Sequence, residues 1–86
     1  MAEYTVTFAR SARRELESLH PPLVQRILSK IEALTVDPRP PGCRKLRGEN
    51  DLWRIRIGDY RVVYAIYDGE RRVDVTAVRH RREAYE

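Results

Sequence analysis

A chain of 86 residues has room for one small domain and leaves no space for a cleft between two lobes. Seventeen Lys and Arg against thirteen Asp and Glu give a net charge of +4, and only two of these cations are lysines. Arginine keeps its charge at any usable pH and binds phosphate through two parallel N–H donors, so this composition favours an anionic partner. The hydrophobic share of 42 % is enough to build a core, which argues against a disordered chain.

The same inventory excludes several classes of protein. The longest apolar stretches are a few residues, far below the roughly 20 needed to span a bilayer, so we expect no membrane contact. The N-terminus has no basic segment followed by an apolar run, and the single cysteine cannot form an internal disulfide, which fits a reducing cytoplasm. Two histidines and one cysteine do not have metal-ligand spacing. We therefore expect one cytoplasmic domain over residues 1–86, without metal or cofactor.

The first half of the chain predicts a strand and two helices. Apolar residues alternate over residues 3–8, which is typical of a half-buried strand. From Ala9 they recur at helical spacing, and this helix should end near His20 because two prolines follow. Those prolines suit the first turn of a second helix, whose apolar stripe runs to Leu34. The Pro- and Gly-rich stretch 37–42 should then form a stiff loop.

The second half predicts three strands. The alternating runs and the turn signals between them are residues 53–57, Gly58-Asp59, residues 60–67, Asp68-Gly69 and residues 73–77. In chain order the elements are β-α-α-β-β-β. We therefore expect an α+β domain in which an N-terminal helical hairpin packs on an antiparallel sheet.

A two-residue turn at Gly58-Asp59 would place arginines together on one face of the sheet. Arg56 then lies directly opposite Arg61, and Arg54 shares their face, which is turned away from the helices. Like charges paired across strands destabilise a sheet by up to about 1 kcal/mol, so they become favourable only when an anion lies among them. A phosphodiester is the natural candidate, because guanidinium groups can stabilise the charge that develops in phosphoryl transfer. The alternative is that these arginines only solvate an exposed face.

Two further basic segments could extend this face. Lys45 and Arg47 lie just before the hairpin and would add cations at its rim. The chain ends in a tail with His80, two more arginines and Tyr85, and an aromatic residue beside arginines is typical of nucleic-acid contact because it can stack on a base. Each segment has a plain alternative as a solvated loop or tail.

These segments together resemble the RelE family of toxins from toxin–antitoxin systems. The resemblance rests on residues 45–48, 53–57, 59–64 and 80–85, which follow the N-terminal strand and the helical pair in the family's order. It runs nearly end to end and implies the family's α+β fold. It also implies a ribosome-dependent mRNA endonuclease that cuts the codon in the A site without a metal, by attack of the substrate 2′-hydroxyl on the adjacent phosphate. A RelB-like antitoxin would block the toxin, and the pair would bind operator DNA as a complex.

The resemblance also implies roles for individual residues. Arg61 and Arg81 match the family's phosphate-binding arginines, and Tyr85 matches the tail tyrosine that stacks on or orients the scissile nucleotide. Arg54 and Arg56 stand where relatives often have lysines, one of them a proposed general base. The implied catalytic set is Arg54, Arg56, Arg61, Arg81 and Tyr85, and the implied RNA contacts are Lys45, Arg47, His80 and Arg82. Because arginine is a poor proton acceptor, either His80 or Tyr85 is the base, or another group moves the proton, or the enzyme is slow.

Other functions stay open. A ParE-like inhibitor of DNA gyrase shares the fold and acts by binding, although such chains generally lack the set of Arg81 and Tyr85. An inert remnant that only binds its antitoxin is a third possibility. In each case we expect the antitoxin to use the exposed sheet face, where Val63, Ala65 and Val78 lie beside the arginines.

Overall fold

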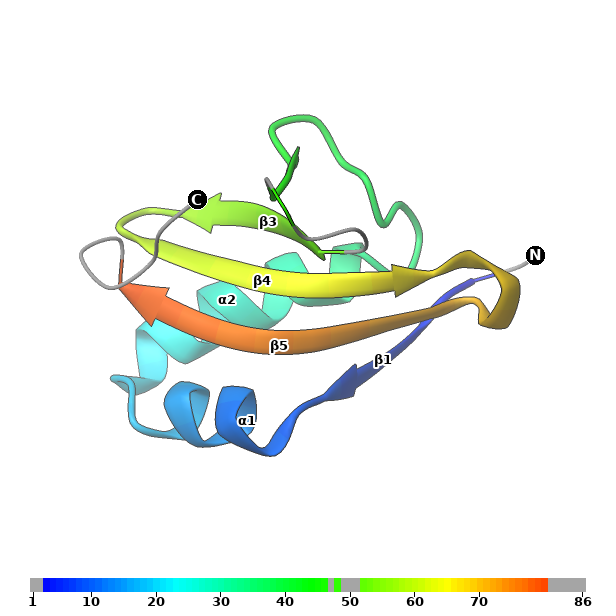
Figure 1. Cartoon of the computed structure of the whole chain (residues 1–86). Helices are drawn as coiled ribbons and strands as arrows, with labels where there is room; N and C mark the ends of the chain where they lie inside the picture. The colour runs from blue at the N-terminus through cyan, green and yellow to red at the C-terminus, as the bar shows by residue number, and fades with distance from the viewer. Residues whose placement is uncertain (1–2, 47, 49–51, 81–86) are drawn as a thin grey trace.

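Two helices cover one face of a five-stranded sheet (Figure 1). The computed structural model describes residues 3–46, 48 and 52–80. In chain order its elements are β1 (Thr5–Phe8), α1 (Arg10–Glu17), α2 (Pro21–Ala33), β2 (Arg44–Lys45), β3 (Leu52–Ile57), β4 (Tyr60–Tyr67), the 3₁₀ turn η1 (Asp68–Glu70) and β5 (Arg72–His80). The expected α+β class and the order of helices and strands are confirmed, with β2 and η1 added.

The strands lie in the order β1-β5-β4-β3-β2. The strands β3, β4 and β5 pair antiparallel in chain order, as the turn signals predicted, and β2, which was not predicted, pairs antiparallel with β3. The strand β1 differs, because it lies parallel to β5 and pairs from Thr5 opposite Arg72 to Phe8 opposite Val75. Alternation identifies a strand but not its partner or its direction, so this edge of the sheet was not predictable from the pattern.

Both helices are bounded by local chemistry. Pro21 and Pro22 occupy the first turn of α2, as predicted, because a missing N–H has no cost there. The helix α1 ends at Glu17, slightly before the expected position, and His20 is the residue that precedes α2. In the described part of the chain, neither helix has the length and apolar character that a bilayer-spanning helix requires.

Apolar side chains from both helices and one sheet face form the core. Its largest fully buried side chain is that of Tyr64 on β4, whose hydroxyl donates a hydrogen bond to the carbonyl oxygen of Pro38 at 2.8 Å. Burial raises the pKa of the Tyr64 phenol, which keeps it protonated as a donor. Trp53 packs half-buried against this core. The other buried core residues are Ala12, Leu16, Ile27, Ile31, Leu34, Ile55, Ile57, Val62, Ile66, Val73, Val75 and Val78.

A bulge interrupts the alternation of β5. Its residues Val75 and Ala77 pair with Tyr64 and Val63, which are consecutive on β4, so Thr76 is the extra residue. Beyond the bulge every side chain of β5 changes face relative to the predicted pattern.

The bulge overturns one prediction about the exposed face. Val78 is only 3 % exposed and belongs to the core, because the shift turns it toward the helices. Ala65 is also buried, and only Val63 of the three residues expected there is half-exposed. The prediction that Val63, Ala65 and Val78 form an apolar patch for an antitoxin is therefore wrong.

Arg39 ties the loop after α2 to the turn after β4. Its guanidinium donates two hydrogen bonds to the carboxylate of Asp68, at 3.2 Å to Oδ1 and 2.9 Å to Oδ2. The same guanidinium lies 5.1 Å from the ring centroid of Trp53, and the hydroxyl of Tyr4 donates to Asp68 Oδ1 at 2.6 Å. The hydrogen bonds from Arg39, and then the one from Tyr4, lower the pKa of Asp68 to about 2.

This lowered pKa predicts an acid-dependent contribution to stability. The contribution of ionised Asp68 is complete above the carboxyl pKa of the unfolded chain, about 3.9, and is lost as the pH falls toward 2. The variant Asp68→Asn should therefore melt at a lower temperature than the wild type near neutral pH, and the two melting temperatures should converge between about pH 4 and pH 2. Thermal melts followed by circular dichroism across this range measure the effect. A difference in melting temperature that stays constant down to about pH 2 would contradict the assignment.

Candidate functional site

The β3–β4 hairpin has the predicted register. Arg56 lies opposite Arg61, and Arg54 lies opposite Val63. The two-residue turn sets this pairing, and Gly58, its first residue, has φ +61°. A glycine with positive φ at that position is typical of the type II′ turn, whose twist matches that of the strands it joins.

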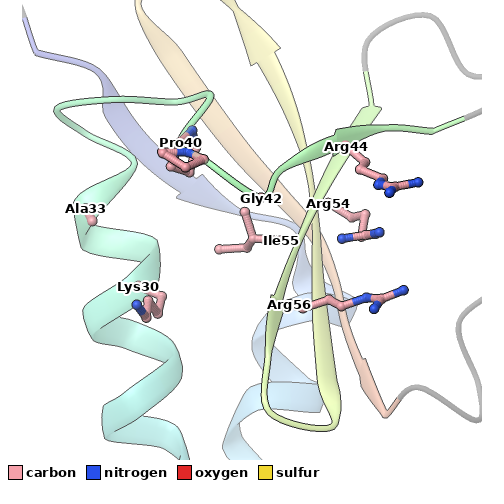
Figure 2. A pocket seen from close by; sticks show the side chains of 9 residues that line it. Lys30, Ala33, Pro40, Gly42, Arg44, Arg54, Ile55 and Arg56 are labelled. Carbon is pink, nitrogen blue, oxygen red and sulfur yellow. The ribbon is translucent and has the colours of Figure 1, made fainter.

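The sheet face turned away from the helices carries more arginines than the sequence predicted. Arg44 on β2 lies opposite Arg54, and Arg79 on β5 lies opposite Arg61. Figure 2 shows Arg44, Arg54 and Arg56 pointing to the same side of β3, away from α2. We call this set the arginine row: Arg44, Arg54, Arg56, Arg61 and Arg79. Its members come from four adjacent strands.

The two additional members could not be found from alternation. The strand β2 has only two residues, so it carries no periodic signal that would assign Arg44 to a face. Arg79 follows the bulge at Thr76, and an unbroken alternation would have turned it toward the helices.

Members of the row differ in how much they offer to a ligand. Arg56 and Arg44 are exposed and Arg61 is half-buried. Arg54 is 3 % exposed, so most of its surface contacts protein. Arg44, Arg56 and Arg79 are therefore the exposed members of the row, and Arg54 is its buried member.

Glu15 of α1 holds one end of the row at the sheet edge. Its Oε2 lies 3.1 Å from Nε of Arg79, and its Oε1 accepts a hydrogen bond from the backbone N–H of Val78 at 2.9 Å. The pairing of β1 with β5 ends at Val75, so Glu15 binds the part of β5 that β1 does not cover. The charge of Arg79 is thus compensated by an acid from α1.

His80 occupies a different place from the one its sequence position indicated. It ends β5 opposite Tyr60, and the two rings meet edge to face, with centroids 5.2 Å apart and an interplanar angle of 86°. Tyr60 packs against the core, and alternation places His80 on that face and Arg79 on the other. The imidazole therefore lies on the opposite face of the sheet from the arginine row.

The remaining predicted residues contribute less to the described geometry. Lys45 is exposed and pairs with Trp53, so alternation turns it away from the face that holds Arg44. The positions Arg47, Arg81, Arg82 and Tyr85 lie outside the described residues. Across residues 3–46, 48 and 52–80, no group of three or more His, Cys, Asp or Glu could hold a metal ion.

Two hollows adjoin the arginine row. The smaller, of about 190 Å³, lies at the hairpin turn and is lined by Arg56, Gly58, Asp59, Tyr60 and Arg61. The larger, of about 560 Å³, lies along the outer edge of β3 (Figure 2) and is lined by Lys30, Ala33, Pro40, Pro41, Gly42, Arg44, Arg54, Ile55 and Arg56. Guanidinium groups at the mouths of such hollows can hold phosphate oxygens through charge-assisted hydrogen bonds.

Comparisons with known proteins point to one family. The family described as ParE toxin of type II toxin-antitoxin system, parDE, matches residues 6–85. A putative RelE-like toxin protein of Escherichia coli is 30 % identical over 86 residues, which cover 95 % of this chain and 90 % of that protein. The structure is similar to the toxin–antitoxin complex RelBE2 of Mycobacterium tuberculosis, with a TM-score of 0.80 and 31 % identity over 91 % of this chain and 98 % of that one. It is also similar to the archaeal RelE–RelB complex of Pyrococcus horikoshii OT3, with a TM-score of 0.82 and 29 % identity over 98 % and 100 % of the two chains.

The turn that aligns Arg56 with Arg61 predicts a sharp contrast between two glycines. Gly58→Ala forces a side chain into the left-handed region and should cost about 1–2 kcal/mol of unfolding free energy. Gly69→Ala is the matched control, because Gly69 has no positive φ and nothing lies within 4 Å of the added carbon. Urea denaturation of both variants measures the difference. Equal stabilities for the two variants would contradict the role assigned to the turn.

Proposed function

Because this chain belongs to the ParE toxin family of type II toxin–antitoxin systems, within the RelE/ParE superfamily, we propose that it is a ribosome-dependent mRNA endonuclease. It would cut mRNA in the ribosomal A site and so inhibit translation. The observation that carries this proposal is the pairing of Arg56 with Arg61 within the arginine row. Like charges at directly opposed strand positions destabilise a sheet by up to about 1 kcal/mol, and a phosphodiester bound by both arginines would offset that destabilisation.

The proposed reaction is a phosphoryl transfer within the RNA. The 2′-hydroxyl oxygen of one nucleotide attacks the adjacent phosphorus, and the bond from that phosphorus to the 5′-oxygen of the next nucleotide breaks. One product keeps a cyclic phosphate, and the proton lost by the 2′-hydroxyl is balanced by one gained at the leaving oxygen. Arg56 and Arg61 would stabilise the negative charge on the phosphoryl oxygens in the transition state.

The proton acceptor in this scheme is not an arginine. Arginine is a poor proton acceptor, so Arg54 and Arg56 would act through their charge. Of the two other groups that the family resemblance suggests, His80 packs against Tyr60 on the opposite face of the sheet. This position supports Tyr85 as the better candidate for the group that accepts or relays the proton.

Substitution of Arg61 tests the proposed chemistry. Arg61→Gln should reduce the single-turnover rate of mRNA cleavage on programmed ribosomes by about 10²-fold or more, as expected for the loss of one donor to the transition state. Arg61→Lys should retain more activity, because it keeps the charge and loses only the forked geometry. Arg13→Gln is the matched control, since Arg13 is exposed on α1 and pairs with Glu17.

Two outcomes would overturn the endonuclease proposal. One is undiminished cleavage by folded Arg61→Gln. The other is a wild-type protein that inhibits DNA gyrase in a supercoiling assay and cuts no mRNA on ribosomes, which would establish the gyrase-inhibitor alternative.

We also propose a RelB-like antitoxin as the partner, because the M. tuberculosis and P. horikoshii relatives are in complexes of that kind. The apolar surface available to it lies near the sheet edge formed by β1. Phe8 and Leu28 are each 36 % exposed and line a hollow of about 560 Å³ together with Leu16 and Val24. An apolar segment of the antitoxin would bury these side chains, and operator DNA would be bound only through the resulting complex.

The antitoxin surface can be tested with two matched substitutions. Leu28→Asp places a charge in the hollow and should weaken antitoxin binding by about tenfold or more, which corresponds to at least about 1.4 kcal/mol. Val36→Asp is the control, because Val36 is 72 % exposed and does not line that hollow. Titration calorimetry with the neighbouring gene product measures both affinities. If the two variants bind the antitoxin equally well, the hollow is not the interface.

A further inference from the structure

The end of β5 can pair with β4 in two registers. In the observed register Arg79 lies opposite Arg61, because the bulge places one extra residue at Thr76. A regular ladder would instead place Val78 opposite Arg61 and turn Arg79 over to the other face of the sheet. Only the bulged register therefore brings Arg79 to the arginine row.

Packing and charge act on this register in opposite directions. The bulge puts the side chain of Val78 into the core and keeps a guanidinium group off the apolar face of the sheet. It also sets Arg79 directly opposite Arg61, and like charges at such positions destabilise a sheet. An acidic group beside Arg79 offsets this repulsion.

Glu15 on α1 is that acidic group, and it binds two consecutive residues of β5. Its Oε1 accepts a hydrogen bond from the backbone N–H of Val78 at 2.9 Å, and its Oε2 accepts one from Nε of Arg79 at 3.1 Å. A shift of one position turns a strand residue over, which reverses the directions of its side chain and of its N–H. A slip of β5 past the bulge would therefore break both contacts at once.

This contact is more sheltered than an ion pair on the surface of the same helix. The side chains of Glu15 and Arg79 are 29 % and 49 % exposed, whereas those of Glu17 and Arg13, 3.5 Å apart on α1, are 67 % and 75 % exposed. Solvent screens exposed pairs strongly and partly buried pairs much less. Of the two glutamates, Glu15 is therefore the one that can constrain its arginine.

The helix α1 holds Glu15 in place over the strand. Ala12 and Leu16 anchor this helix in the core. Ser11 lies one turn before Glu15 on the same side of the helix, and its hydroxyl oxygen is 3.5 Å from the carbonyl oxygen of Thr76, the extra residue of the bulge. One side of α1 thus contacts both the bulge and the strand end beyond it.

We propose that Glu15 is a positioning residue for the arginine row. Its carboxylate fixes the end of β5 through Val78 and orients Arg79 through Nε. The contact uses the Nε–H of the guanidinium, so the N–H groups on its terminal nitrogens remain as donors to a phosphate. Glu15 therefore acts on the reaction through Arg79 and does not itself bind the RNA. This inference rests on the proposed function for the reacting phosphate, but both contacts of Glu15 can be measured without any cleavage.

Two substitutions of Glu15 separate its contacts. Glu15→Gln keeps an oxygen that accepts a hydrogen bond from the N–H of Val78, and it loses the negative charge that holds Arg79. Glu15→Ala loses both contacts. Glu17→Gln is the matched control, because it removes the same charge from α1 and breaks only the exposed pair with Arg13.

Hydrogen exchange followed by NMR measures the two contacts directly. The Nε–H of Arg79 should exchange about tenfold faster or more in Glu15→Gln and in Glu15→Ala, as expected for loss of a hydrogen bond to a charged acceptor. The backbone N–H of Val78 should exchange faster in Glu15→Ala than in Glu15→Gln. Both exchange rates should stay at the wild-type values in Glu17→Gln.

A double-mutant cycle with Arg79 tests the effect on the reaction. In single-turnover cleavage on programmed ribosomes, Glu15→Gln should lower the rate at saturating toxin by about tenfold, part of the roughly 10²-fold expected for loss of one donor to the transition state. In an Arg79→Gln background the same substitution should lower the rate no further, because Glu15 acts through Arg79. A merely structural role would lower the rate by the same factor in both backgrounds.

The proposal is overturned if the Nε–H of Arg79 exchanges at the wild-type rate in Glu15→Gln, or if Glu15→Gln lowers cleavage equally in both backgrounds. Failure of the endonuclease proposal gives a different result. A wild-type protein that cuts no mRNA, but in which the exchange of the Arg79 Nε–H depends on Glu15, would refute the endonuclease and support the positioning of Arg79. A Glu15→Gln variant that cuts mRNA at the wild-type rate would retain the endonuclease and refute the role of Glu15.

Discussion

The pairing of Arg56 with Arg61 is the constraint on which the rest of the site depends. A two-residue turn leaves the strands no freedom to move these like charges apart, and Gly58 supplies the backbone conformation that the turn requires. The turn therefore holds the two arginines at directly opposed positions on one face of the sheet. A site assembled in this way has little left to reorganise when an anion arrives, which is how charge stabilisation becomes effective in catalysis.

Charge and apolar surface are separated on this small molecule. The arginine row crosses β2 to β5 and the larger hollow beside it lies along the outer edge of β3, whereas the hollow lined by Phe8 and Leu28 lies at the other end of the strand order, where β1 forms the edge. This separation would let one toxin bind RNA and an antitoxin by different means. The proposed function also fits the small size of the protein. A ribosome would position the mRNA, and so supply the deep active site for which a chain of 86 residues has no room.

Local patterns in the sequence were sufficient to predict the hairpin and most of the core. Alternation and a turn dipeptide determine which residues face one another across β3 and β4, because both are properties of neighbouring residues. Partners far apart along the chain were not predictable. The parallel pairing of β1 with β5, the bulge at Thr76 that buries Val78, and the approach of Arg26 to Gly58 all arise from tertiary packing. The arginine row was therefore predicted in its middle and missed at both ends.

Glu15 has a consequence beyond its ion pair with Arg79. The outer edge of β5 past Val75 is a stretch of backbone that another chain could extend by strand pairing, which is a common route to aggregation. The carboxylate of Glu15 accepts a hydrogen bond from the backbone N–H of Val78, and α1 packs against the same stretch of β5. A strand of a second copy therefore cannot pair with this stretch. The open end of β5 is thereby covered by α1 and by the carboxylate of Glu15, which protects a sheet edge without a further strand.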